Sequence, residues 1–81
     1  MELPLSYLTE PTTFERAASE HAHNGRPFGH VEDDWKMLLA SRREGDELWD
    51  FAPPSREVIQ LWGVALVRAG RVISTVITAV N

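Results

Sequence analysis

The chain has 81 residues, and its 8 basic and 12 acidic side chains give a formal net charge of -4. No basic stripe is visible, which argues against a nucleic-acid-binding protein. The absence of cysteine excludes disulfides and thiolate metal sites. A hydrophobic content of 43% is too high for a disordered chain, and the length fits a single domain spanning residues 1–81.

The two ends of the sequence bear on localisation. Met1–Pro4 is acidic and is not followed by an apolar run, so no secretory signal is predicted. The apolar C-terminal stretch is interrupted by Arg56, Arg68 and Arg71, which leaves less than the ~20 apolar residues of a membrane span. We therefore expect a soluble, cytoplasmic protein that does not contact a membrane.

Residues 1–10 are expected to form an extended arm. Leu3, Leu5 and Tyr7 alternate with other residues, and Pro4 suits an edge strand. An apolar arm must dock somewhere, either on its own core or on a neighbouring subunit by exchange.

Two helices are predicted next. In the first, Thr12 is the expected N-cap with Glu15 completing a capping box, and Asn24-Gly25 ends the helix. Its apolar face comprises Phe14, Ala17, Ala18 and His21. The second is predicted over 32–43, with an inward face of Val31, Trp35, Leu38, Leu39 and Arg42. A strand over 35–42 is the alternative, but none of residues 36–40 is β-branched, which favours the helix.

A short strand is predicted at Glu47–Phe51, where Leu48 faces one side while Trp49 and Phe51 face the other. Pro53-Pro54 stops it. A third, short helix is predicted over 55–62, and Gly63 ends that helix.

A β-hairpin is predicted over 63–80, giving the chain an α+β fold. We expect a mainly antiparallel sheet of three to four strands packed against two to three helices. Arg68-Ala69 suits a type I turn with Gly70 left-handed in a bulge. A type I′ turn would need a positive φ at Ala69, which its Cβ disfavours.

Both faces of this hairpin are apolar. One is predicted to carry Val64, Leu66, Val72, Val76 and Val80, and the other Ala65, Val67, Ile73, Ile77 and Thr75. Leaving four or five such side chains exposed would forgo roughly 6–15 kcal/mol, similar to the stability of a whole domain. Helices and the arm could cover both faces. Alternatively a second copy covers one, and we expect a homodimer whose interface is Val64, Leu66, Val72, Val76 and Val80.

The histidines His21, His23 and His30, with Glu32 and Asp33, have the chemistry of a divalent-metal site. Residues two apart on a helix point in nearly opposite directions, so His21 and His23 cannot share an ion there. A buried, structural His21 is the favoured interpretation, and no metal or cofactor is expected. The acids at 32–34 are explained by a helix N-terminus.

Trp49, Phe51 and Pro54 are the predicted ligand or partner surface, because an aromatic strand beside stiff prolines is easy to bind. Glu47 and Asp50 flank Trp49, and with His30 they are the candidate polar groups of a cleft between sheet and helices. No catalytic sequence surrounds any serine.

The segments at 45–51 (GDELWDF), 53–55 (PPS) and 63–72 (GVALVRAGRV) resemble a pattern found in small uncharacterised bacterial proteins. The resemblance covers under half of the chain. It implies a fold but no activity, so no functional residue transfers. Small orphan proteins of this kind are often carried on mobile elements such as gene cassettes.

The sequence therefore favours a small, non-enzymatic, dimeric binding or adaptor protein that uses the aromatic surface. The alternative is a small ligand-binding domain or enzyme with a cleft between sheet and helices. A pocket holding a histidine or carboxylate would favour this alternative.

Overall fold

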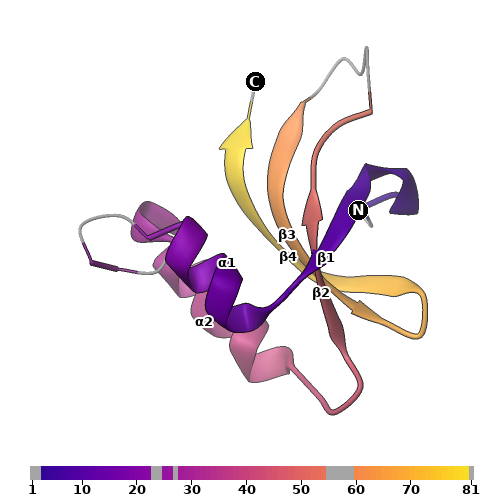
Figure 1. The fold of residues 1–81 in the computed structure, drawn as a ribbon, viewed down its shortest axis with the longest axis horizontal. Helices are drawn as coiled ribbons and strands as arrows, with labels where there is room; N and C mark the ends of the chain where they lie inside the picture. Colours follow the sequence, from indigo (N-terminus) through magenta and orange to yellow (C-terminus); the bar gives the residue numbers. More distant parts are fainter. Residues whose placement is uncertain (1–2, 23–24, 27, 55–59, 81) are drawn as a thin grey trace.

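The computed structural model describes residues 3–22, 25–26, 28–54 and 60–80. Four antiparallel strands form one sheet in the order β1-β2-β3-β4: Leu8–Thr12, Glu47–Phe51, Leu61–Arg68 and Arg71–Val80. The helices α1 (Phe14–Glu20) and α2 (Glu32–Ser41) lie together against one face of this sheet (Figure 1). Two short 3₁₀ turns, η1 (Leu5–Tyr7) and η2 (Gly29–Val31), precede β1 and α2. The predicted α+β class is confirmed.

Both α-helices were anticipated by the sequence, but each ends earlier than predicted: α1 ends at Glu20 and not at Asn24-Gly25, and α2 ends at Ser41 and not at residue 43. α2 begins at Glu32 as predicted, is helix and not strand, and buries Trp35 and Leu38. α1 begins one residue later than predicted, because its N-cap is Thr13, whose hydroxyl accepts a hydrogen bond from the Arg16 amide at 3.0 Å. Thr12 instead ends β1, opposite Leu48 of β2. Because Thr12 is paired in the sheet, Thr13 is the threonine that caps the helix.

The strand β2 has the predicted bounds and the predicted alternation. The third helix predicted over 55–62 is wrong at its C-terminal end, because Leu61 and Trp62 already belong to β3, opposite Val80 and Ala79. Residues 55–59 lie outside the described residues. The pairing with β4 extends β3 by two residues on the N-terminal side of Gly63.

The hairpin turn differs from the expectation. Ala69 and Gly70 both have positive φ, 52° and 77°, and Arg68 pairs with Arg71. This is the two-residue type I′ geometry, which matches the twist of the flanking strands. A register shift follows, because Leu66 pairs with Ser74 and Val67 with Val72. Ile73 is the extra residue of this bulge.

The bulge changes which side chains share a face. Val64, Leu66 and Val76 are fully buried beneath the helices with Leu38 and Leu48. Val72 instead joins the opposite face, so the prediction that it shares their face is wrong. The outer cluster comprises Phe51, Ala65, Val67 and Val72, against which pack Leu3, Tyr7, Leu8, Trp49 and Leu61.

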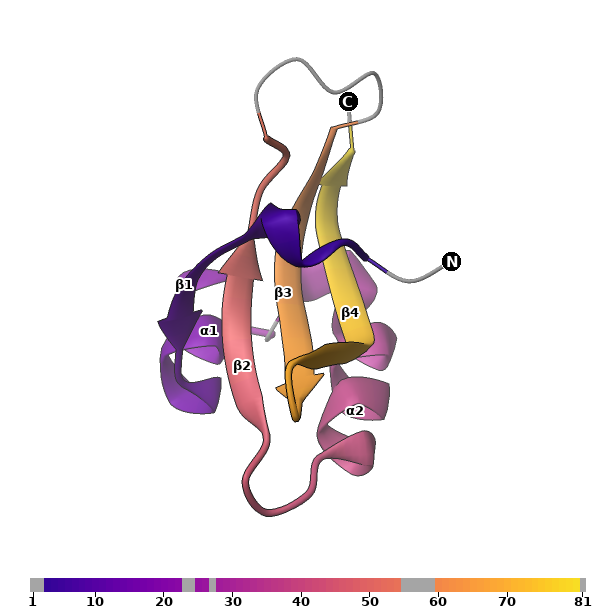
Figure 2. The ribbon, with the colours of Figure 1, turned by 90° about the vertical axis from the view of Figure 1, so that its right-hand side faces the viewer.

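The N-terminal arm covers this outer face. Figure 2 shows the segment before β1 crossing the sheet on the side opposite to the helices. Of the two expectations for the arm, docking on its own chain is therefore observed. Of the predicted dimer interface, Val64, Leu66 and Val76 are covered within one chain, Val72 is 8% exposed, and Val80 is 67% exposed. Neither α1 nor α2, nor any other helix in the described part of the chain, has the length and apolar character that crossing a bilayer requires.

Candidate functional site

The predicted aromatic surface is only partly exposed. Phe51 is 3% exposed and packs beneath the arm, so it does not lie on the surface. Trp49 and Pro54 are half-buried. Trp49 lies on the outer face, where its indole N–H donates to Glu47 Oε1 at 3.1 Å. Glu47 therefore lies with Trp49 on the outer face, away from the helices. Because Phe51 is buried and Trp49 and Pro54 are half-buried, the three predicted residues do not form an open aromatic patch.

A column of stacked rings joins α1, η2 and α2. The His21 and Phe28 ring centroids lie 4.8 Å apart, and Phe28 and Trp35 lie 4.4 Å apart. Phe14 continues the column at 6.3 Å from Trp35, and the Arg42 guanidinium covers Phe14 at 4.5 Å. Such stacked pairs contribute roughly 0.5–1.5 kcal/mol each beyond their burial. His21 is thus the end of this column of stacked rings, but it is only half-buried, so the expectation of a buried core histidine is met in part.

Phe28 occupies an unusual backbone conformation beside His21. Its φ is 61° and its ψ 10°, which is the left-handed region that a bulky residue rarely enters. Its amide donates to the carbonyl of His21 at 3.1 Å, and its carbonyl accepts from Val31 at 2.9 Å. Left-handed geometry costs an L-residue about 1–2 kcal/mol, so packing of the ring must hold it there. Residues held in this way cluster at binding sites.

An open depression of about 430 Å³ lies beside this strained residue. The C-terminal end of α1, η2 and β4 surround it. Its lining residues are Glu20, His21, Ala22, Phe28, Gly29, His30, Val31 and Thr78. We call this depression the groove. It combines two imidazoles, a carboxylate and a hydroxyl with the apolar contribution of Phe28 and Val31.

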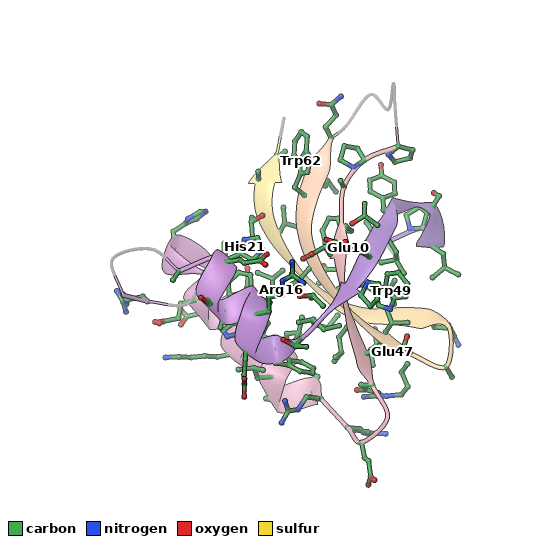
Figure 3. The ribbon with its side chains drawn as sticks, viewed as in Figure 1. Glu10, Arg16, His21, Glu47, Trp49 and Trp62 are labelled. Atoms are coloured by element: carbon green, nitrogen blue, oxygen red, sulfur yellow. The ribbon has the colours of Figure 1, made fainter. Side chains whose placement is uncertain are left out.

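Carboxylates gather on the sheet side of α1. Glu10 of β1 lies directly opposite Asp50 of β2, on the face that the helices cover, and Glu20 faces them from α1. Burial raises the pKa of Asp50 above its usual value, and the nearby charges of Glu20 and Glu10 raise it further. His21 and Arg16 oppose this increase. Figure 3 shows Glu10, Arg16 and His21 around the space between α1 and the sheet.

Arg16 is a cation that interacts with all three of these acids. Its Nε lies 2.6 Å from Glu20 Oε1, and both side chains are substantially exposed. One arginine therefore faces three carboxylates, Glu10, Glu20 and Asp50. Like charges directly opposite one another on a sheet are destabilising. The region beside the groove therefore carries more negative than positive side chains.

The structure brings together only part of the predicted cleft. His30 lines the groove and Asp50 lies near its α1 wall, whereas Glu47 is on the other face of the sheet. Glu10, Arg16, Glu20, Phe28 and Thr78 were not predicted as site residues. Their only sequence signal is the pair of acids at 10 and 50, which becomes meaningful once the strand register is known. Among the described residues, no three histidine or acidic side chains are grouped to hold a metal ion.

Comparisons with known proteins found no matching family model, no similar curated protein and no similar solved structure.

Proposed function

We propose that this protein binds a small organic cation in the groove, with an aromatic or other apolar part of the ligand over Phe28. The single observation that carries the proposal is the set of three carboxylates beside the α1 wall of the groove. Glu10 and Asp50 oppose each other directly across two strands, and Glu20 faces them. Natural proteins tolerate such local conflicts chiefly where function requires them.

The pKa of Asp50 is consistent with this ligand chemistry. Its carboxyl is half-buried among like charges, which favours the protonated form. A bound cation would reverse this effect, because it stabilises the ionised carboxylate. Binding and deprotonation of Asp50 are then linked, so affinity should increase as the pH rises through the raised pKa of Asp50.

The adaptor hypothesis has less support from the geometry. It relied on Trp49, Phe51 and Pro54 as an exposed surface, and Phe51 is buried. A depression lined by His21 and His30 is the feature that favours the ligand-binding alternative. Among the described residues, the lining contains no recognised nucleophile–base pair, and we propose binding and not a reaction.

Three matched probes test the charge of the ligand: benzylamine, benzyl alcohol and benzoate. Each is titrated into ¹⁵N-labelled protein, and amide chemical shifts are followed by NMR. We expect benzylamine to shift the amides of 20–22, 28–31 and 78, benzyl alcohol to shift them more weakly, and benzoate to leave them unchanged. Equal perturbation by benzoate would contradict a cation site.

Two conservative variants locate the charge. Asp50→Asn removes one carboxylate from beside the α1 wall of the groove and keeps the shape of the side chain. Glu44→Gln removes an exposed carboxylate from the turn after α2 and serves as the control. We expect Asp50→Asn to weaken benzylamine binding by roughly fivefold or more, and Glu44→Gln to leave it unchanged. Equal benzylamine affinities for the two variants would show that Asp50 does not contribute to binding.

A further inference from the structure

The outer edge of β4 is the longest unpaired strand edge in the described part of the chain. β4 is the last strand in the sheet order, and among the described strands it pairs with β3 alone. α2 and η2 contact it from the helix-covered face of the sheet, and Figure 2 shows it at the border of that sheet. Alternate residues of such a strand direct backbone N–H and C=O groups outward, where another strand can pair with them.

The composition of β4 makes this edge unusual. From Val72 to Val80 it contains no charged residue and no proline. Ile73, Ile77 and Val80 are 41%, 37% and 67% exposed. Native proteins normally protect a free edge with charges or proline. Within the described strand itself, the irregularities are the register shifts at Ile73 and Thr78, which leave a regular run over 74–77.

The opposite edge of the same sheet is protected in the usual way. β1 is half as long as β4 and contains Glu10 and Pro11. Its register with β2 shifts between Leu8 and Glu10, and the Thr9 hydroxyl donates to the Asp50 carbonyl at 3.0 Å. One edge is thus charged, short and irregular, while the other is long and apolar. This asymmetry indicates that the β4 edge is normally occupied.

We propose that β4 pairs antiparallel with β4 of a second copy of this chain, about a two-fold axis near Thr75 and Val76. Antiparallel pairing about such an axis brings identical edges together, which requires that the edge carry no repelling charge. β4 meets this requirement over 72–80. A foreign strand would find no charge here to recognise, and complementary charges normally give partners their specificity.

The pairing would extend the two sheets into one continuous antiparallel sheet. The axis is perpendicular to the sheet, so the helices of both copies lie on the same side. Thr78 lies on β4 and also lines the groove, so the two grooves of the dimer would both adjoin the new seam. The inference does not depend on what the groove binds.

The first test measures the mass of the full chain by sedimentation equilibrium from about 1 to 500 µM. We expect twice the 9.1 kDa mass of one chain at the upper concentrations. Ile77→Lys should return the mass to that of the monomer, because it places a charge at the centre of the seam. Met37→Lys is the matched control: Met37 is 68% exposed on α2, and this variant should remain dimeric.

A second measurement uses the unmodified protein, so that an unfolded variant cannot obscure the result. Amide hydrogen exchange is compared at low and high protein concentration. We expect the outward amides of 74–77 to gain protection at high concentration, while those of β1 do not. A monomer mass throughout, or dimerisation that survives Ile77→Lys and leaves 74–77 unprotected, would overturn the proposal.

Discussion

Gly63 is the position where a single methyl group should damage the fold most. It lies in β3 opposite Ile77, next to the register shift after Trp62. A Cβ built on Gly63 would overlap the backbone carbonyl oxygen of Val76, and would come within 3.0 Å of the Val76 carbonyl carbon and 3.1 Å of the Ile77 Cα. These are backbone atoms, so no side chain can rotate away to relieve the contact.

The magnitude follows from the movement that Gly63→Ala requires. Non-bonded carbon atoms prefer about 3.5–4.0 Å, so β3 and β4 must separate locally by roughly an ångström. This stretches ladder hydrogen bonds from about 2.9 Å towards 4 Å, beyond hydrogen-bonding range. Two weakened bonds cost about 2 kcal/mol, and overpacking adds about 1–3 kcal/mol. We expect the free energy of unfolding to fall by about 3–5 kcal/mol.

Gly70→Ala is the matched control, since it makes the same chemical change in the same hairpin. The φ of Gly70 is 77°, and nothing lies within 4 Å of its built Cβ. Only backbone strain remains, with a cost of about 1–2 kcal/mol. Urea denaturation followed by circular dichroism measures both variants. The close-approach argument fails if Gly63→Ala is no more destabilising than Gly70→Ala.

Three further changes test other parts of the structure. Ala69→Asn should raise the free energy of unfolding by about 1 kcal/mol, because asparagine tolerates the φ of 52° in a type I′ turn; no gain in urea denaturation would argue against that turn. Arg68 holds the pKa of Asp46 at about 2, so stability should be maintained above about pH 4 and decline as the pH falls towards 2. Melting curves of Asp46→Asn should lack this decline in stability at low pH. If the variant still loses stability in that range, a group other than Asp46 causes the decline. Phe28→Ala should lower the free energy of unfolding by about 3 kcal/mol through loss of the central ring of the column, whereas Leu5→Ala, at an exposed position, should change it by less than about 0.5 kcal/mol.

Sequence patterns predicted the elements whose period is strong. The acids at 32–34 and the inward spacing of Trp35 and Leu38 predicted the start and face of α2, and the alternation of Leu48 and Trp49 predicted β2. Less was predictable where two local signals compete. Thr12 and Thr13 are both good caps, and only the pairing of Thr12 with Leu48 decides between them.

The hairpin shows a different limit. Alanine propensity argues against a positive φ at Ala69, yet the twist of the two long strands imposes it. Tertiary context therefore outweighed a local cost of about 1–2 kcal/mol. The resulting shift at Ile73 moved Val72 to the other face, a change that alternation alone does not reveal.

The candidate site was predictable only in part for a similar reason. Asp50 and His30 were identified as cleft groups from their residue types. The carboxylates beside the groove also include Glu10 and Glu20, which are forty and thirty residues from Asp50 in the sequence. Their proximity results from the β1–β2 register and from the path of α1, neither of which has a local signature.

The apolar hairpin first suggested a dimer because both of its faces must be covered. The structure meets that requirement within one chain, since α1 and α2 cover one face and the arm packs on the other. The free energy of face burial therefore no longer requires a partner. What remains exposed is an edge, and an edge is completed by backbone hydrogen bonds as well as by apolar contact. The case for a second copy thus moves from Val64, Leu66 and Val76, which are buried, to Ile77 at the border of the sheet. The two proposals can fail independently: Asp50→Asn should reduce cation binding in a protein that still dimerises, and Ile77→Lys should separate the copies without removing the carboxylates beside each groove.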